Sequence, residues 1–305
     1  MKHILFFALL LFWAGPILQA QETIQERLGY SADAKLLIIH ADDVGVIHSV
    51  NQATFKAFES GSVNSASIMV PTPWLTEVAE YAKTHPNHDM GIHLTLTSEW
   101  KLLKWGSVAS ASDVPSLLDA NGYFYDNCDE LWENANIDEV ELELRAQIDK
   151  AIAMGIHPTH LDSHMGCSFS TDPRYYDLYL KLAKDYGIPA MVEYQNLQPD
   201  TKESLKPTLI IDHRFSAGPG AYDTSMAKFY ANTLRNLVPG VNVMTIHCSY
   251  DNMESQGMSF ERIYWGANWR QQDFDFFTSE ECARILEEEN IHLVTWKELG
   301  TLISK

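Results

Sequence analysis

The chain has 305 residues, 46% of them hydrophobic, so it can bury a full core in one large domain or in two smaller ones. It carries 41 acidic against 22 basic residues, a formal net charge of −19. This charge argues against nucleic acid, other polyanions and anionic membranes as partners, and it fits a neutral or cationic small substrate.

The first twenty residues have the pattern of a secretory signal peptide. Lys2 precedes an apolar run, a Gly15-Pro16 break and a small residue, Ala20, after which we expect cleavage. The apolar run is shorter than the ~20 residues that span a membrane, and no later stretch is long enough. We therefore expect a signal peptide over 1–20, a mature chain over 21–305, no membrane span, and export to the periplasm or the extracellular space.

Strand-like and helix-like segments alternate along the mature chain, which predicts a parallel sheet with crossover helices. In chain order the expected strands cover 36–43, 63–70, 89–97, 158–164, 188–194, 209–215, 241–250 and 291–295. The expected helices cover 50–58, 74–83, 138–154 with Asp138 as the N-cap, 175–186, 227–237 and 279–289. Two polar stretches, 98–136 and 251–272, are expected to be long surface loops of the lid or binding type. The simplest architecture is a single α/β domain, an irregular (β/α) TIM-like barrel.

The first expected strand ends on two adjacent acids. Four apolar residues, Leu36-Leu37-Ile38-Ile39, predict a strand buried on both faces, and Asp42-Asp43 follow almost at once. Buried carboxylates need a metal ion, a cationic partner or ordered water to compensate their charge. The alternative is that the pair caps the strand and begins a solvated turn in which Gly45 supplies the bend.

Two later strands carry titratable groups on one face. Period-two alternation places His93 with two threonines on one face of 89–97, where a single histidine is more often a hydrogen-bonded core residue than a ligand. His160, Asp162 and His164 share one face of 158–164, which packing alone does not explain. Together with the acid pair they suit a catalytic metal site, in which imidazoles bind the ion and a carboxylate orients one of them. His247 ends a further strand, a suitable place for a general acid.

Three motifs in this order and spacing resemble those of the YdjC-like carbohydrate deacetylases, which include the chitooligosaccharide deacetylases. They read IIHADDVGVIHSVN, GIHLTLT and PTHLDSH, and the terminal IHLVTWKEL resembles that family's closing segment. The resemblance runs from Leu36 to Leu299. It implies an irregular (β/α) barrel related to the polysaccharide deacetylases, and a homodimer.

Carried over by residue, the resemblance implies that Asp43, His93 and His164 bind one divalent metal ion and that Asp42 is the general base. It places His247 where the family has a histidine after an apolar strand, as the general acid. Zinc or magnesium is the expected metal, and manganese, cobalt or nickel would also suit the ligands.

One segment departs from the family pattern. The family continues past the metal-binding histidine with further histidines, whereas here Met165-Gly166-Cys167 follow, which changes the expected pocket wall and therefore the substrate. The four cysteines, Cys128, Cys167, Cys248 and Cys282, show no zinc-finger spacing, and an oxidising compartment permits disulfides. Because Cys167 and Cys248 each lie just beyond a proposed site histidine, we hypothesise a disulfide between them.

The resulting hypothesis is a metal-dependent hydrolase that removes acetyl groups from N- or O-acetylated mono- or oligosaccharides. The alternatives are another barrel metallohydrolase, cleaving a phosphoester or a cyclic amide, and an exported carbohydrate-binding protein without activity. The sugar, the acetyl linkage and the oligomeric state are left open by the sequence.

Several other side chains have less specific interpretations. His40 is expected to be structural, and Arg270 to pair either with acids of the site or with Asp273. Aromatic residues of the two long loops either stack on sugar rings or pack down as anchors; they are Trp100, Trp105, Trp132, Tyr250, Trp265 and Trp269.

Overall fold

The computed structural model describes residues 22–169, 173–192 and 211–303. The signal peptide expected over 1–20 lies outside these residues and stays a prediction. In the part of the chain that is described, no helix is both long and apolar enough to cross a membrane.

Within the described residues, seven parallel strands form one sheet. They are β1 (Lys35–Val44), β2 (Ser65–Ile68), β3 (Met90–Leu94), β4 (Leu161–Ser163), β5 (His213–Ser216), β6 (Gly240–Ile246) and β7 (Ile291–Leu293). Their order across the sheet is β4-β3-β2-β1-β6-β5, and β7 pairs with the first residues of β1. β1 is therefore central, and the carboxyl ends of its neighbours meet beside its own end.

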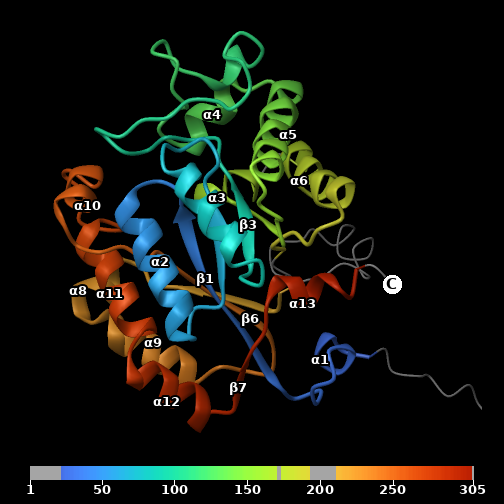
Figure 1. Ribbon diagram of the computed structural model, residues 1–305, viewed down its shortest axis with the longest axis vertical. Helices are drawn as coiled ribbons and strands as arrows, with labels where there is room; N and C mark the ends of the chain where they lie inside the picture. The colour runs from blue at the N-terminus through green and yellow to red at the C-terminus, as the bar shows by residue number, and fades with distance from the viewer. Residues whose placement is uncertain (1–21, 170–172, 193–210, 304–305) are drawn as a thin grey trace, which may run out of the picture.

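Helices cover both flanks of this sheet. They are α1 (Ile24–Arg27), α2 (His48–Ser60), α3 (Leu75–Thr84), α4 (Cys128–Asn134), α5 (Ile137–Ala153), α6 (Pro173–Tyr186), α8 (Pro219–Thr224), α9 (Met226–Arg235), α10 (Met253–Met258), α11 (Ala267–Phe277), α12 (Glu280–Glu288) and α13 (Trp296–Gly300), with the short 3-10 helices η1 (Pro115–Leu117) and η2 (His164–Phe169). Figure 1 shows α2, α9, α11 and α12 on one flank and α5 beside α6 on the other.

The continuous apolar run of β1 reflects two cores, one on each face of the strand. Leu37 and Ile39 pack into the larger cluster, with residues of the surrounding helices, whereas Leu36 and Ile38 pack into a smaller cluster with residues of β6 and α13. A strand buried on both faces needs apolar residues at every position, which is the pattern seen in the sequence.

The fold is α/β with a parallel sheet that forms a half-barrel, so the expected irregular (β/α) TIM-like barrel is confirmed as an α/β fold but is not a full barrel. Of the strand expected over 188–194, residues 193 and 194 lie outside the described part, and the others form only an isolated bridge, between Ala190 and Leu161. The strand expected over 209–215 appears as β5, with residues 209 and 210 outside the described part. A ladder that would close the barrel past β4 is therefore absent among the described residues.

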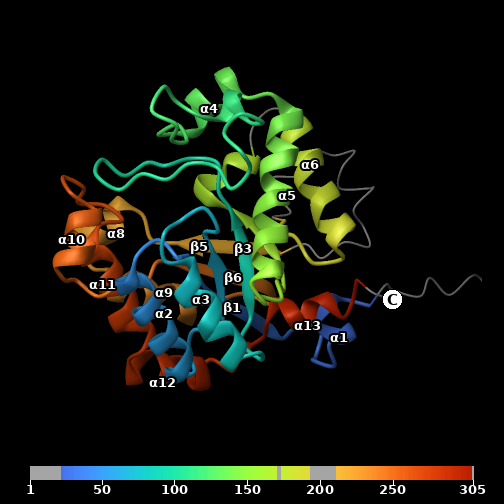
Figure 2. The same cartoon turned by 45° about the horizontal axis from the view of Figure 1, so that its top comes forward.

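The two predicted long loops contain helices. Residues 98–136, here called the excursion, include η1 and α4 and extend beyond the carboxyl end of β1 (Figures 1 and 2). Residues 251–272 include α10 and the beginning of α11. The expected N-cap, Asp138, lies inside α5. The N-cap is Asn136, two residues earlier, whose side chain accepts a hydrogen bond from the Asp138 N–H, at 2.9 Å.

Candidate active site

The acid pair lies at a bulge where β1 ends. The register of β1 against β2 shifts between Ala41 and Val44, and Asp43 has a φ of 69°. In a regular strand adjacent side chains point to opposite faces, but an extra residue in a left-handed conformation re-aims its side chain. Both acids therefore reach the same cluster of side chains, and they are only 5% and 3% exposed. Strain of this kind in a non-glycine residue is common at functional sites.

Asp43 lies between the two predicted metal-binding histidines. Its Oδ1 is 3.4 Å from His93 Nε2 and 3.3 Å from His164 Nδ1, and all three residues are buried. Asp43 Oδ1 has no hydrogen-bond partner. One carboxylate oxygen and two ring nitrogens, all within 4.8 Å of one another, form a donor set that fits a divalent metal ion.

Each of these three side chains is held on its far side by a charged group. His93 Nδ1 is 2.9 Å from Asp162 Oδ1, and His164 Nε2 is 2.9 Å from Glu99 Oε2. When His93 Nδ1–H and His164 Nε2–H each donate a hydrogen bond to their carboxylate, the other nitrogen of each ring keeps its lone pair free toward Asp43. Arg270 Nη2 donates to Asp43 Oδ2 at 2.6 Å.

Electrostatics in the cluster favour positive charge on the imidazoles. Burial lowers the pKa of His164, but the charge of Glu99 raises it to about 9. Burial likewise opposes charge on His93, but Asp162 and Asp42 raise its pKa well above the ordinary value. For Asp43, burial alone raises the pKa, but Arg270 holds it well below the usual range. The carboxylates therefore create a site for cations.

Asp42 is adjacent to this donor set without being part of it. Its Oδ1 is 3.1 Å from His40 Nε2, and its Oδ2 is 4.0 Å from His93 Nε2 and 3.8 Å from His247 Nε2. Burial raises the pKa of Asp42, but His93 and then His40 lower it below its ordinary value. Asp42 is therefore ionised near neutral pH, and its Oδ2 faces the imidazoles of His93 and His247.

His40 bridges the two carboxylates beneath the site, as expected of a structural residue. The ring is fully buried, and it lies within 3.1 Å of both Asp42 and Asp162. Burial lowers the pKa of His40, but these two acids raise it to about 9. Although the three residues are close enough to hold an ion, a protonated His40 already compensates one of the two carboxylate charges.

His247 is the most accessible of the five predicted site residues, with a side chain that is 18% exposed. Burial lowers its pKa to about 4, so the imidazole is neutral near pH 7. Its backbone N–H donates to Asp273 Oδ2 at 2.8 Å, and this places the residue at the end of β6 beside Asp42.

His160 is not brought to the site with Asp162 and His164. Its ring is fully buried and stacks on Trp296, with centroids 5.2 Å apart. Gly91 on the neighbouring strand makes room for it, since a Cβ there would lie 2.4 Å from the ring. Of the three side chains predicted on one face of 158–164, only Asp162 and His164 therefore lie in the cluster around Asp43.

Sequence reasoning missed Glu99 and left the partner of Arg270 open. Glu99 is 8% exposed and belongs to the excursion, and its only sequence signal was a carboxylate shortly after the strand of His93. Arg270 pairs with Asp43 and not with Asp273, which accepts hydrogen bonds from Tyr230 and from the His247 backbone.

The aromatic residues of the loops differ in burial. Trp100, Trp105 and Trp269 are at most 3% exposed and pack down as anchors, Trp132 and Tyr250 are partly buried, and Trp265 is 38% exposed. The Trp100 ring lies 5.3 Å from the Arg262 guanidinium and 5.4 Å from that of Arg270.

The hypothesis of a disulfide between Cys167 and Cys248 is wrong. Cys167 is bonded to Cys128 at the start of α4, whereas Cys248 is a fully buried thiol. The excursion returns beside η2 and so brings Cys128 to within a Cα distance of 5.4 Å of Cys167. Burial raises the pKa of the Cys248 thiol well above its ordinary value.

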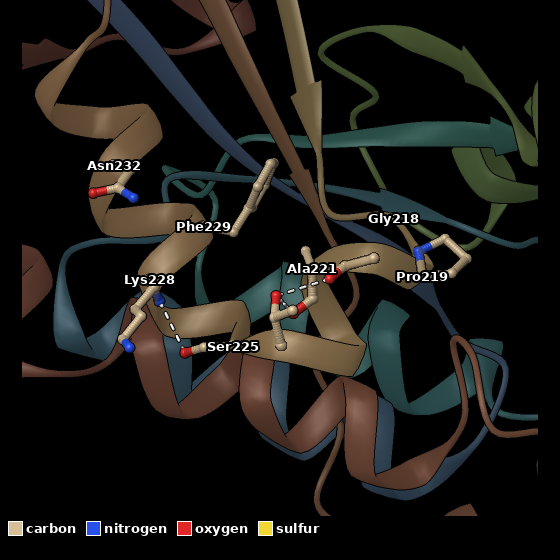
Figure 3. A pocket seen from close by; sticks show the side chains of 9 residues that line it. Gly218, Pro219, Ala221, Ser225, Lys228, Phe229 and Asn232 are labelled. Carbon is tan, nitrogen blue, oxygen red and sulfur yellow. Dashed lines mark hydrogen bonds between the residues drawn. The ribbon is translucent and has the colours of Figure 1, made fainter.

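A surface hollow of about 520 Å³ lies apart from these residues. It is formed by α8 and the first turns of α9, including Ala221, Lys228 and Phe229, and none of the site residues lines it (Figure 3). Its walls are largely exposed, and they carry no buried charged group.

The chain is similar to several known proteins. The family model described as YdjC-like protein matches residues 36–288. A protein named carbohydrate deacetylase from Thermus thermophilus is 30% identical over 283 residues, which cover 89% of this chain and 96% of the relative. One of the same name from Brevibacillus brevis is 32% identical over 266 residues, covering 87% and 99%. Among solved structures, a protein of Enterococcus faecalis V583 described as a cellobiose-phosphate cleavage protein has a TM-score of 0.73 and 25% identity, covering 87% and 99%.

Proposed function

Because this chain belongs to the family of YdjC-like proteins, we propose that it is a metal-dependent hydrolase that removes acetyl groups from N- or O-acetylated carbohydrates. The names of its relatives support the carbohydrate and the acetyl group. The observation that carries the proposal is the buried Asp43 Oδ1, which faces His93 Nε2 and His164 Nδ1 and has no hydrogen-bond partner.

Asp43, His93 and His164 would hold the metal ion, with zinc or magnesium expected and manganese, cobalt or nickel as alternatives. When bound, such an ion lowers the pKa of water and polarises a carbonyl group. Asp162, Glu99 and Arg270 fix the orientation of these three side chains through the hydrogen bonds on their far sides.

Asp42 is the general base in this proposal. Its Oδ1 lies 3.1 Å from His40 Nε2, and its Oδ2, which is turned toward His93 and His247, can accept a proton from the attacking water. The lowered pKa of Asp42 keeps this carboxylate ionised at neutral pH.

His247 is the general acid. Burial keeps the His247 imidazole neutral near pH 7, so it must take up a proton before it can protonate a departing amine or alkoxide. Asp42 Oδ2 lies 3.8 Å from His247 Nε2, so the two groups can act in sequence.

We also propose that the protein is exported, on the strength of the predicted signal peptide. The Cys128–Cys167 disulfide supports this proposal, because disulfides persist mainly in oxidising compartments. The homodimer that the family resemblance implies stays a prediction.

The test is acetate release from a panel of N- and O-acetylated mono- and oligosaccharides, with and without chelator, and with Asp42→Asn as the blank. We expect chelator-sensitive release by the wild type and none by the blank. Silence across the panel, in protein shown to hold its metal, would contradict the proposal. A phosphorylated disaccharide belongs in the panel, because the Enterococcus relative is described as cleaving one, and cleavage of this probe without acetate release would favour that reaction.

A further inference from the structure

The segment between α10 and α11, residues 259–266, is tied to both sides of the candidate metal site. Arg262 Nη2 donates to the backbone oxygen of Glu99 at 2.8 Å, and Glu99 holds His164. Arg270 donates through Nε to the backbone oxygen of Trp265 at 2.8 Å and through Nη2 to Asp43. Since a single guanidinium makes both contacts, Trp265 lies beside the ligand set and not at the far end of a loop.

The backbone of this segment has a fixed and unfavourable shape. Glu261 and Trp265 have φ values of 63° and 56°, in the left-handed region that large residues rarely adopt. A Cβ on Gly266 would lie 2.6 Å from the backbone oxygen of Arg262, so the turn tolerates only glycine there. Glycine or asparagine would suit the conformation of position 265 better than tryptophan. A large side chain at a strained position is typical of a functional role.

The Trp265 ring is stacked on one face and contacted edge-on by Tyr264, with centroids 6.4 Å apart. It stacks on Trp269 with centroids 4.9 Å apart and an angle of 24°, and Trp269 stacks in turn on Tyr222 at 5.2 Å and 12°. Trp269 is 1% exposed, whereas Trp265 at the outer end of the stack is 38% exposed. The stack therefore ends in the exposed Trp265 ring, whose backbone oxygen is bonded to the guanidinium that holds Asp43.

We propose that Trp265 is a stacking platform for a sugar ring next to the acetylated unit. The inference rests on the proposed function and adds a substrate-binding residue to it. A pyranose ring presents C–H bonds to the negative face of an aromatic ring, and a preformed stack needs no ordering on binding. The net charge of −19 favours a neutral or cationic saccharide over an anionic one.

The test measures saccharide affinity in the metal-loaded Asp42→Asn protein, in which turnover is blocked. The probes are N-acetylglucosamine and its β-1,4-linked disaccharide, and the dissociation constants come from calorimetry. Trp265→Ala should raise the constant for the disaccharide about tenfold, the scale of one lost aromatic stacking contact, and leave that for the monosaccharide unchanged. Trp265→Phe should retain most of the affinity. Trp265→Gly removes the same ring and suits the left-handed backbone, so it controls for misfolding of the alanine variant. It should give the same dissociation constants as Trp265→Ala.

Tyr123→Ala is the matched control, since this ring is 41% exposed and belongs to a turn of the excursion. It should change neither constant. Three outcomes would each overturn the platform. The Trp265 variants could bind as tightly as the Asp42→Asn parent, they could lose equal affinity for both probes, or the parent could bind neither probe. Acetate release from monosaccharides together with unchanged disaccharide binding would overturn the platform and leave the deacetylase proposal intact. If disaccharide binding depends on Trp265 but the wild type releases no acetate, the platform stands and the deacetylase proposal is overturned.

Discussion

The ends of the strands and the loops around them contribute different parts of the candidate site. β1 and β3 carry Asp42, Asp43 and His93, whereas Glu99 and Arg270, which bond the donor set from outside, belong to the excursion and to α11. A strand fixes a side chain through its ladder, but a loop residue needs contacts of its own to stay in place. The difference suggests that strand residues supply the chemistry and that loop residues determine how firmly the ion is held.

The largest effects are expected at the strand ends. Asp42→Asn should lower turnover by about 10²- to 10⁴-fold, because it removes the base, and should leave the metal content unchanged. His93→Ala should lose both metal and turnover, because it removes a ligand. Metal analysis after dialysis, together with acetate release, separates the two outcomes. Near-normal turnover in Asp42→Asn would break the assignment of Asp42 as the base.

A smaller effect is expected from the covalent link between the excursion and η2. The Cys128–Cys167 disulfide closes a loop between positions 39 residues apart, and opening it should lower the free energy of unfolding by about 2 to 4 kcal/mol. Because Cys167 follows His164 by three residues, the metal should also dissociate faster. Denaturant unfolding and chelator-driven metal release, each with and without reductant, measure the two effects.

The control for this experiment is the double variant Cys128→Ser/Cys167→Ser. It should match the reduced wild type and should not respond further to reductant, since the remaining cysteines Cys248 and Cys282 are free thiols. A wild type that keeps its stability and its metal in reductant would show that the excursion does not need the covalent link.

The smallest effect is expected from the carboxylate behind His164. Glu99→Ala should weaken metal binding by about 10- to 100-fold, because the ring loses the hydrogen bond that sets its tautomer. Glu99→Gln should fall between this variant and the wild type, since its amide oxygen still accepts a hydrogen bond. Competition with a chromophoric chelator gives the affinities.

Glu143→Gln is the control for Glu99, because Glu143 is also buried and also contacts the excursion, through the backbone N–H groups of Val108 and Ala109. It should leave metal affinity unchanged. Equal affinities in the wild type and both Glu99 variants would contradict the view that loop residues set the strength of metal binding.

Local sequence patterns predicted the strand-end residues well because their placement follows from periodicity. The apolar run before Asp42 and the alternation around His93 both point to strands, and parallel strands bring their carboxyl ends together. The same reasoning placed His160 with His164, yet His160 lies against Trp296 below the site. Periodicity gives the face of a strand but not the depth at which each residue lies.

Partners that are distant in sequence could not be predicted in this way. Glu99 and His164 are 65 positions apart, and Arg270 and Asp43 are 227 apart. Such pairs depend on how the loops fold back over the sheet, and no local pattern records that path. The same limit explains the wrong disulfide partner for Cys167, since closeness to a site histidine in sequence did not predict the return of the excursion to η2.

The sequence by itself determined the family, the alternation of strands and helices, and the acids and imidazoles at the strand ends, because these follow from motifs and from short-range periodicity. Only the tertiary structure decided that the sheet is a half-barrel, that Asp43 turns inward at a bulge, that Glu99 and Arg270 hold the donor set, and that Cys128 bonds to Cys167. These features depend on contacts between segments far apart in the chain, whose free energies are realised only when the whole chain packs.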